Sequence, residues 1–111
     1  MKCGEIWFVD FGNTAIGHEY KKNRPVLVIQ CDEQIRVANV ITIIPFTSQD
    51  KSHKDDILVP KDKTNNLYFD SVVKVHHIQS FDKTRFIKKL GILEKETMEK
   101  IKDYLKRHFE I

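Results

Sequence analysis

The chain contains 111 residues and carries 19 Lys and Arg against 16 Asp and Glu, which leaves a formal net charge of +3 at pH 7. With 41% hydrophobic and 32% charged residues, the composition is that of a globular protein and excludes a disordered or collagen-like chain. The length suits one domain over residues 1–111, since domains cluster near ~100–150 residues. Apolar runs such as Val40–Ile44 are far shorter than the ~20 residues of a membrane helix, and no secretory signal is visible. We therefore expect a cytoplasmic protein with no membrane partner.

The first half of the chain predicts three strands. Residues Gly4–Phe11 alternate in polarity, as a half-buried strand does. The run Val26–Gln30 is almost continuously apolar, which is typical of a strand buried on both faces. We predict a turn at Asp32–Gln34 and a long third strand at Arg36–Ile44, ended by Pro45 because proline cannot donate to a sheet ladder.

The second half predicts further short strands and then a helix. The strands are expected at Ile57–Val59, Ser71–Ile78 and Leu90–Leu93, with one helical turn at Asp82–Phe86. From Glu94 to Phe109, apolar residues recur at spacings of 3 and 4, which predicts an amphipathic helix with an apolar stripe of Met98, Ile101, Leu105 and Phe109. The expected fold is mainly β with a C-terminal helix (α+β class), built on a small, strongly bent antiparallel sheet or a partly open barrel.

Neither the histidines nor the paired carboxylates predict a metal site. His76 and His77 fall on the predicted strand Ser71–Ile78, where neighbouring side chains point to opposite faces and cannot easily share one ligand. Asp55 and Asp56 lie in a Lys-rich loop, where solvation of the charges is the simplest explanation. Phosphate-binding loops and dinucleotide fingerprints are absent from the sequence as well. We therefore expect no metal and no cofactor.

Two neighbouring stretches concentrate polar groups that suit a binding or catalytic site. The segment Gly12–Arg24 is longer than most hairpin loops, and long loops on a rigid sheet often carry binding sites. The stretch Pro45–Gln49 places the hydroxyls of Thr47 and Ser48 and an amide where the third strand stops. The side chains of the first stretch suit phosphate binding and proton transfer: Asn13, His18, Glu19, Tyr20, Lys21, Lys22 and Arg24. From the residues alone, a simpler alternative remains. The segment Gly12–Arg24 would then be a surface loop without a role, Arg24 would pair with a carboxylate, and Thr47 would cap a turn.

A set of stretches in order along the chain carries a more specific signal: Gly4–Asp10, Gly17–Glu19, Arg24–Ile29, Pro45–Gln49, Asp70–Val73, Ile78–Lys83 and Gly91–Phe109. Together they resemble the MazF/PemK family of toxin endoribonucleases over nearly the whole chain. The resemblance implies a small SH3-like barrel of the MazF/CcdB type, assembled as a homodimer. It also implies the toxin of a type II toxin–antitoxin system, a metal-independent, sequence-specific endoribonuclease that cleaves single-stranded RNA, in particular mRNA.

The resemblance further implies which residues carry the chemistry. The family's catalytic arginine lies in the Arg-Pro pair that begins the second strand, here Arg24, and its catalytic threonine lies in the Pro-x-Thr segment, here Thr47. In the implied reaction the ribose 2′-hydroxyl attacks the adjacent phosphate and leaves a 2′,3′-cyclic phosphate and a 5′-hydroxyl. A guanidinium suits bidentate phosphate binding, and the hydroxyl of Thr47, with that of Ser48, suits donation to a non-bridging oxygen. Glu19 and His18 are hypotheses for proton transfer.

Contacts with RNA are expected from residues beside that centre: Asn13, Tyr20, Lys21, Lys22, Gln49, His77 and Gln79. Where many family members carry Gln-x-Arg or Gln-x-Lys, this chain has His77-Ile78-Gln79, which alters one expected RNA contact. Single-stranded RNA is bound by aromatic side chains that stack on bases and by basic side chains along the backbone. Further candidates for these roles are Phe46, Phe69 and Lys74, although Phe46 follows an apolar strand and fits a core position better.

The resemblance implies a cognate antitoxin as the protein partner, with an acidic or amphipathic segment that competes for the basic groove. Operator DNA is an expected partner only through the toxin–antitoxin complex. The alternative is a non-catalytic SH3-like barrel that acts as a binding module, either a gyrase-poison-like toxin or an inactive paralogue, since a fold does not decide function. The pairing of Arg24 with Thr47 favours the enzyme, because a gyrase-type binder has no need of it.

Overall fold

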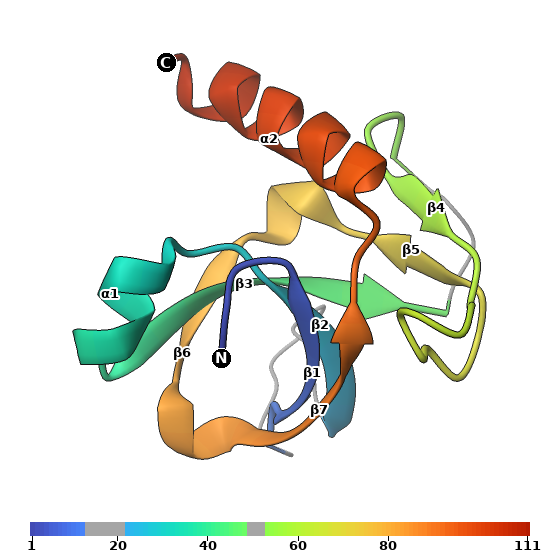
Figure 1. The fold of residues 1–111 in the computed structure, drawn as a ribbon. Coiled ribbons are helices and arrows are strands. Elements are labelled where there is room, and N and C mark those ends of the chain that lie inside the picture. Colours follow the sequence, from blue (N-terminus) through green and yellow to red (C-terminus); the bar gives the residue numbers. More distant parts are fainter. Residues whose placement is uncertain (13–21, 49–52) are drawn as a thin grey trace.

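The computed structural model describes residues 1–12, 22–48 and 53–111, which form a curved antiparallel sheet and a long C-terminal helix (Figure 1). The strands are β1 (Glu5–Asp10), β2 (Asn23–Val28), β3 (Val40–Thr47), β4 (Ile57–Val59), β5 (Ser71–Val73), β6 (Gln79–Asp82) and β7 (Phe86–Ile92). The helices are α1 (Asp32–Val37) and α2 (Lys95–Phe109), with short 3₁₀ turns η1 (Val75–His77) and η2 (Lys83–Arg85). The expected class, mainly β with a C-terminal helix, is confirmed.

Strand β3 organises the sheet because it pairs with three other strands. The order is β4-β5-β3-β2-β1-β7, and β6 also pairs with β3. The first half of β3 pairs with β6 as far as Ile43, and its last residues, from Phe46, pair with β5. Pro45 lies between these two partners, and its carbonyl accepts the backbone N–H of Lys74. Since the N–H and C=O of one strand residue face the same neighbour, the missing N–H of Pro45 falls where the ladder changes partner. The prediction that Pro45 ends the strand is therefore wrong, and β3 continues to Thr47.

The segment before β3 also differs from the prediction. Residues 32–37 form α1, where a turn and the beginning of a strand were expected. The helix begins with the acidic Asp32 and Glu33 and carries Arg36 in its last turn, which suits the helix dipole. Its single buried side chain, Ile35, joins the sheet core. The stretch thus lacks the alternating buried side chains of a strand, and it does not extend the sheet.

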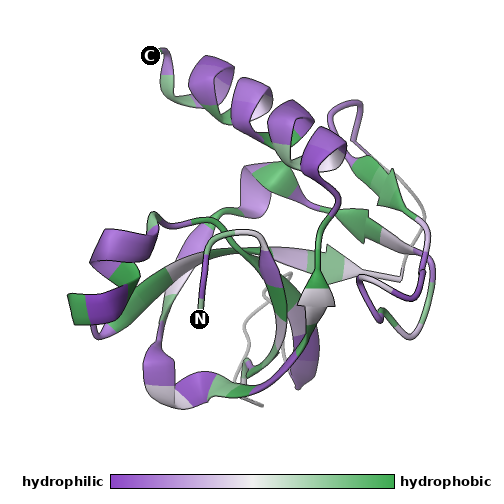
Figure 2. Cartoon of the chain, viewed as in Figure 1, coloured by the Kyte–Doolittle hydropathy of each residue, from purple (hydrophilic) through white to green (hydrophobic). Residues whose placement is uncertain are grey.

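The central strands are buried on both faces, as the apolar run in β2 predicts. Val26, Leu27 and Val28 are all fully buried. Leu27 packs in a cluster with Ile44 and Phe46 of β3 and with residues of α2, whereas Val26 and Val28 pack on the other side with Ile41 and Ile43. Figure 2 shows the hydrophobic colouring along the strands and a largely hydrophilic α2. The alternation therefore distributes one continuous apolar run between two core clusters.

The predicted strand Ser71–Ile78 is interrupted. The strand β5 ends at Val73, η1 follows, and β6 begins at Gln79. The N–H of His77 donates to the carbonyl of Lys74, which closes this turn, and Val75 is fully buried. The histidines 76 and 77 consequently lie on a turn, and the argument that a strand points them to opposite faces does not apply.

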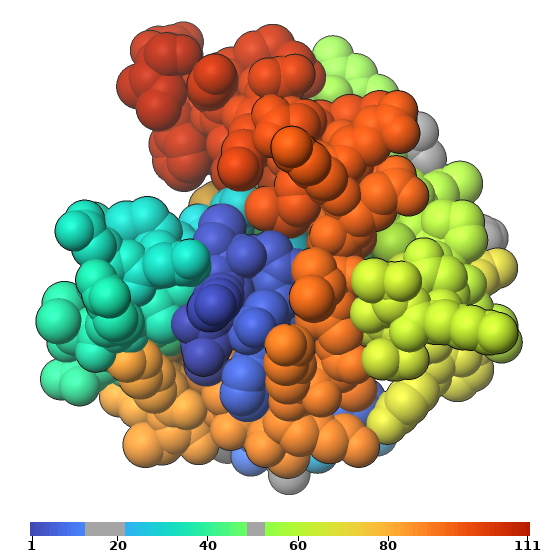
Figure 3. Space-filling view, in the orientation of Figure 1, coloured from blue at the N-terminus to red at the C-terminus, as the bar shows by residue number. Residues whose placement is uncertain are grey.

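The predicted bounds of the C-terminal helix are confirmed to within one residue, and α2 packs across one end of the sheet. Met98 and Ile101 are buried against the cluster that contains Leu27, and Leu105 is partly buried there. Phe109 is exposed, so the predicted stripe covers the core only along its first three members. In Figure 3, α2 lies above the surface formed by β1 and β7. On that surface, α1 lies to the left of these strands and the chain around residues 60–70 lies to their right.

Among the helices of the described residues, none is both long and apolar enough to span a membrane.

Candidate active site

A cavity of about 390 Å³ opens where β2 begins and β3 ends. This volume falls in the range of small-molecule sites, roughly 300–1,000 Å³. Charged and hydroxyl-bearing side chains and aromatic rings share its wall, which consists of Phe8, Lys22, Asn23, Arg24, Pro25, Phe46, Thr47, Ser48, Tyr68, Phe69 and Leu90. Both predicted catalytic residues, Arg24 and Thr47, are therefore in one wall.

The register of the sheet explains why these two residues meet. Strands β2 and β3 are antiparallel, with Val26 opposite Pro45. Arg24 lies two residues before Val26 on β2 and Thr47 lies two residues after Pro45 on β3, so both lie beyond the last paired residues at the same end of the two strands. Residues two apart on a strand share a face. Because the chain turns back through α1 between β2 and β3, two residues that are distant in the sequence come to lie in one cavity wall.

The two side chains differ in exposure. Thr47 is 5% exposed, Arg24 is half-buried and Ser48 is exposed. A buried hydroxyl on a paired strand has little freedom to reorient, and Arg24 lies partly exposed in the same wall at the start of β2. The cavity wall therefore combines a buried hydroxyl with a partly exposed arginine.

The long segment after β1 departs beside this cavity. Gly12 has a φ of 76°, a conformation that glycine adopts without strain. The N–H of Lys22 donates to the carbonyl of Gly12, and the N–H of Phe11 donates to the carbonyl of Lys22. These bonds hold the start and the end of the segment side by side, with Lys22 in the cavity wall. The predicted residues Asn13, His18, Glu19, Tyr20, Lys21 and Gln49 lie outside the described residues.

Three aromatic side chains, Phe8, Tyr68 and Phe69, form an aromatic wall within the lining of the cavity. The rings of Phe8 and Tyr68 are 5.2 Å apart between centroids, and Phe69, 66% exposed, lies beside them in the lining. The ammonium of Lys88 is 5.6 Å from the centroid of the Phe8 ring. Exposed aromatic rings next to a positive charge suit stacking with nucleobases. Sequence reasoning selected Phe69 but missed Phe8 and Tyr68, because only the fold brings β1 next to residues 68–69.

The chain that carries Tyr68 and Phe69 is held by a buried amide. Asn65 is 2% exposed. Its Oδ1 accepts the backbone N–H groups of Asp62 and Leu67, and its Nδ2 donates to the carbonyl of Pro60. The same chain packs on β7 at Gly91, where a Cβ atom would lie 2.2 Å from the carbonyl oxygen of Thr64. The position of the aromatic wall therefore depends on one amide and on one residue without a side chain.

Three other predicted RNA contacts lie away from this wall. His77 is on η1 and Gln79 is on β6, where its Nε2 donates to the carbonyl of His77, and neither is part of the cavity lining. Lys74 is buried, with its Nζ 2.6 Å from Oδ2 of Asp56, so it does not follow an RNA backbone. Phe46 is fully buried in the core while also contributing to the cavity floor.

A second group of polar side chains lies between β4 and η1. Asp56 is 2% exposed, which contradicts the expectation that the charges at 55 and 56 are solvated. Oδ1 of Asp56 is 3.7 Å from Nδ1 of His76, and the ring of His53 stacks on that of His76 with centroids 4.3 Å apart. Burial lowers the pKa of His76, and the nearby His77 and His53 lower it further, while the carboxylate of Asp56 acts to raise it. Sequence reasoning missed this group because it placed His76 on a strand and Asp56 in solvent.

The chemistry available in the cavity follows from its lining. Lys22 and Arg24 supply positive charge, Thr47 and Ser48 supply hydroxyl donors, and among the described residues no carboxylate takes part. An anion is attracted to such a wall, and a guanidinium fork suits two phosphate oxygens at once. The arrangement fits a phosphodiester at the Arg24–Thr47 edge with a base on the aromatic wall.

Comparison with known proteins places the chain among toxins. Residues 2–109 match the family model described as the PemK-like, MazF-like toxin of type II toxin–antitoxin systems. The endoribonuclease EndoA of Bacillus subtilis (strain 168) is 32% identical over 106 residues, which cover 95% of this chain and 90% of that protein. A crystal structure of MazF from Deinococcus radiodurans has the same fold, with a TM-score of 0.83 at 21% identity over 100% of this chain and 97% of the other. An endoribonuclease of a mycobacterial species, solved with its cognate antitoxin, superposes with a TM-score of 0.80 at 16% identity over 100% and 96% of the two chains.

Proposed function

We propose that this chain, which belongs to the PemK-like, MazF-like toxin family of type II toxin–antitoxin systems, is a metal-independent endoribonuclease that cleaves single-stranded mRNA at specific sequences. The observation that carries the proposal is the cavity in which Arg24 and Thr47 share a wall with exposed aromatic rings. The relative EndoA, named an endoribonuclease, supports it at 32% identity.

In the proposed reaction the guanidinium of Arg24 binds two oxygens of the scissile phosphate. The ribose 2′-oxygen loses its proton and forms a bond to phosphorus, while the bond from phosphorus to the 5′-oxygen breaks. The leaving oxygen takes up a proton and becomes a 5′-hydroxyl, and the other fragment ends in a 2′,3′-cyclic phosphate. The hydroxyl of Thr47 donates to a non-bridging oxygen as negative charge develops there, with Ser48 beside it. Glu19 and His18 remain the proposed groups for proton transfer.

The bases on either side of the scissile phosphate then contact the aromatic wall. Phe8, Tyr68 and Phe69 offer ring faces, and Lys22 and Lys88 offer positive charge to the flanking phosphates. Further RNA contacts are proposed for Asn13, Tyr20, Lys21, Gln49, His77 and Gln79. Those contacts, rather than Arg24 or Thr47, would set the sequence that is cut.

We also propose that the protein acts as a homodimer in the cytoplasm and is inhibited by a cognate antitoxin. Two solved relatives, from a mycobacterial species and from Deinococcus radiodurans, are complexes with an antitoxin. An acidic segment of the partner would compete with RNA for the charge of Lys22 and Arg24. Operator DNA would be bound through the complex. Residues 1–111 act as one domain in this proposal, because β2 and β3 contribute to both core clusters.

The test is to incubate the purified protein with long single-stranded RNAs in EDTA and to map the fragment ends. The wild type should cut at discrete sites and leave 5′-hydroxyl ends. Arg24→Ala should abolish cutting, and Arg36→Ala should not, because Arg36 is an exposed arginine on α1. Folding of each variant is checked by thermal unfolding.

Absence of cutting by the folded wild type across several diverse RNAs would overturn the enzymatic proposal. The protein would then be the non-catalytic binding module, either a gyrase-poison-like toxin or an inactive paralogue. Cutting that Arg24→Ala retains would leave a nuclease but remove Arg24 from its mechanism.

A further inference from the structure

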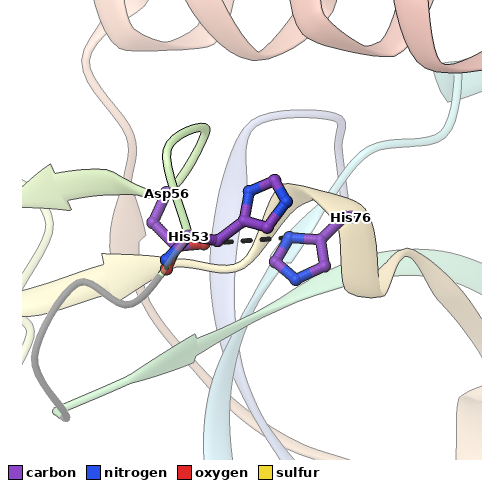
Figure 4. A group of neighbouring side chains, drawn as sticks. All are labelled: His53, Asp56 and His76. Carbon is purple, nitrogen blue, oxygen red and sulfur yellow. Dashed lines mark hydrogen bonds and ion pairs between the residues drawn. The ribbon is translucent and has the colours of Figure 1, made fainter.

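The group between β4 and η1 has the composition of a metal site. His53 and Asp56 come from the chain just before β4, and His76 comes from η1 (Figure 4). One nitrogen of each imidazole and one carboxylate oxygen of Asp56 lie within 4.8 Å of one another. None of the three residues lines the cavity that contains Arg24 and Thr47. The group is therefore separate from the proposed catalytic chemistry.

The nitrogen of His76 that faces this group is buried and lacks a hydrogen bond. Nδ1 of His76 has no hydrogen-bond partner within the described part of the chain, although it lies 3.7 Å from Oδ1 of Asp56. Buried polar atoms are normally satisfied, and a water or an ion at that position is one of the physical explanations for an exception. A buried nitrogen that lacks a hydrogen bond and faces a carboxylate oxygen is a position that a cation can occupy.

We propose that His53, Asp56 and His76 bind one divalent transition-metal ion, with Zn²⁺ as the representative. Imidazole and carboxylate ligands together suit Zn²⁺ and its neighbours, whereas Mg²⁺ and Ca²⁺ take oxygen ligands. In a tetrahedral zinc site with bonds of about 2.0–2.1 Å, ligand atoms lie roughly 3.3–3.5 Å apart. The pair formed by Asp56 and His76, 3.7 Å apart, is already close to that spacing. The ligand atoms of the whole group lie within 4.8 Å of one another, so the remaining approach is at most roughly 1.5 Å.

Neighbouring groups orient two of the three ligands. The Nζ of Lys74 binds Oδ2 of Asp56 at 2.6 Å, which directs Oδ1 toward His76. Oδ2 of Asp55 lies 3.8 Å from Nδ1 of His53. The backbone N–H of Asp55 donates to the same Nδ1 at 3.1 Å, which orients the ring. A metal on Nε2 would move the proton of the neutral ring to Nδ1 and replace this bond by one to the carboxylate of Asp55, an arrangement found behind many zinc-bound histidines. The positive charge of Lys74 repels the ion, so the affinity of the site for the metal is lower than that of the same three ligands without a lysine beside them.

The ion would join the chain before β4 to η1. These two segments are far apart in sequence and meet in the described structure through the pair of Asp56 and Lys74 and the stacked rings of His53 and His76. A bound metal adds a third connection between them and stabilises the folded state by mass action. Its role is therefore structural or regulatory, and cleavage of RNA in EDTA does not depend on it.

The test is a calorimetric titration of the metal-free full-length protein with Zn²⁺, repeated with Co²⁺ to record the absorption of a tetrahedral complex. The wild type should bind one equivalent and gain thermal stability, and Mg²⁺ should give neither effect. His76→Ala should weaken Zn²⁺ binding by more than about 100-fold, because loss of a direct ligand exceeds the roughly 10–100-fold effect of losing a group behind a ligand. The matched control is His108→Ala, which removes an exposed histidine of α2.

A second variant keeps the test decisive if His76→Ala fails to fold. His53 is partly exposed, with 42% of its side chain accessible, so His53→Ala should fold and should lose at least about tenfold in affinity. The proposal is overturned if the wild type binds no Zn²⁺, or if His53→Ala and His108→Ala bind it as the wild type does. Either result leaves the RNA cleavage test unaffected, because that test is performed without metal.

Discussion

The cavity and the group around Asp56 both gather polar side chains, but they are built in different ways. In the cavity, Arg24 and Thr47 are placed by the register of β2 and β3, whose backbone pairing continues into the core. Around Asp56, the polar groups hold one another, since Lys74, His76 and His53 converge on a carboxylate that water hardly reaches. We infer that loss of one cavity residue costs activity and little stability, whereas loss of one member of the second group costs stability.

The largest expected effect is in the second group. Asp56→Ala leaves the ammonium of Lys74 buried without its carboxylate, and removal of one partner of a buried ion pair costs about 3–5 kcal/mol. The free energy of unfolding should fall by that amount in urea titrations performed in EDTA. Asp55→Ala is the matched control and should change it by less than about 1 kcal/mol, as expected for a partly exposed charge.

A double variant separates the buried charge from other effects at Asp56. Adding Lys74→Met removes the buried ammonium as well, and replacement of a buried ion pair by apolar side chains is often close to neutral. Most of the lost stability should therefore return. If Asp56→Ala costs no more than Asp55→Ala, the pair does not hold this region together, and the contrast with the cavity fails.

The next effect concerns the cavity. Thr47→Val keeps the shape of the side chain and removes the hydroxyl, so RNA cleavage should fall by about 10²–10³-fold, the usual cost of losing one oxyanion donor. The free energy of unfolding should change by no more than about 1 kcal/mol. Cleavage rates under single-turnover conditions and urea titrations measure the two quantities on the same preparation.

The matched control for this variant is Thr97→Val on α2, which removes a hydroxyl outside the cavity. It should leave cleavage unchanged. A loss of stability in Thr47→Val as large as its loss of activity would show that the hydroxyl supports the fold, and the distinction between the two regions would disappear.

The same contrast explains which features the sequence could predict. The apolar run of β2 predicts two-sided burial because period and hydrophobicity act locally, and Val26–Val28 are indeed fully buried. The stripe of α2 is likewise a local pattern. Arg24 and Thr47 were selected through the family resemblance, and their presence in one cavity wall follows from strand order. Local patterns and ordered motifs thus suffice where the sheet positions the side chains.

The features that were missed depend on contacts between distant segments. Nothing near Asp56 in the sequence indicates burial, because the groups that compensate its charge are Lys74 and His76, about 20 residues away. Pro45 reads as a strand end unless it is known that β3 changes partner there. Tyr68 meets Phe8 across the fold, and Gly91 lets the chain at Thr64 and Asn65 approach β7 closely. Contacts of this kind, between segments that are distant in the sequence, leave no periodic pattern in the sequence itself.

The smallest expected effect concerns Glu5, which is placed by the sheet and whose charge is also compensated by neighbouring groups. Glu5 is buried on β1, and its carboxylate accepts hydrogen bonds from Nε1 of Trp7 and the N–H of Lys2, with the Nζ of Lys89 3.0 Å away. Burial acts to raise the pKa of Glu5, but the bonds from Trp7, Lys89 and Lys2 outweigh it, so the pKa lies below its ordinary value near 4.5. Glu5→Gln should lower the free energy of unfolding at pH 7 by about 1 kcal/mol, because the amide keeps one acceptor and loses the charge.

The pH dependence gives this variant its own control. A carboxyl group with a lowered pKa in the folded state stabilises the protein fully above the unfolded-state pKa, and this contribution is lost as the pH falls through the folded-state pKa. The difference between wild type and Glu5→Gln should therefore be constant from pH 7 to about pH 5 and should shrink in more acidic solution. A difference that stays constant at acidic pH would mean that shape and hydrogen bonding at Glu5 matter and its charge does not. The sheet register would then position Glu5 as it positions Thr47, and only the group around Asp56 would depend on mutual compensation of charge.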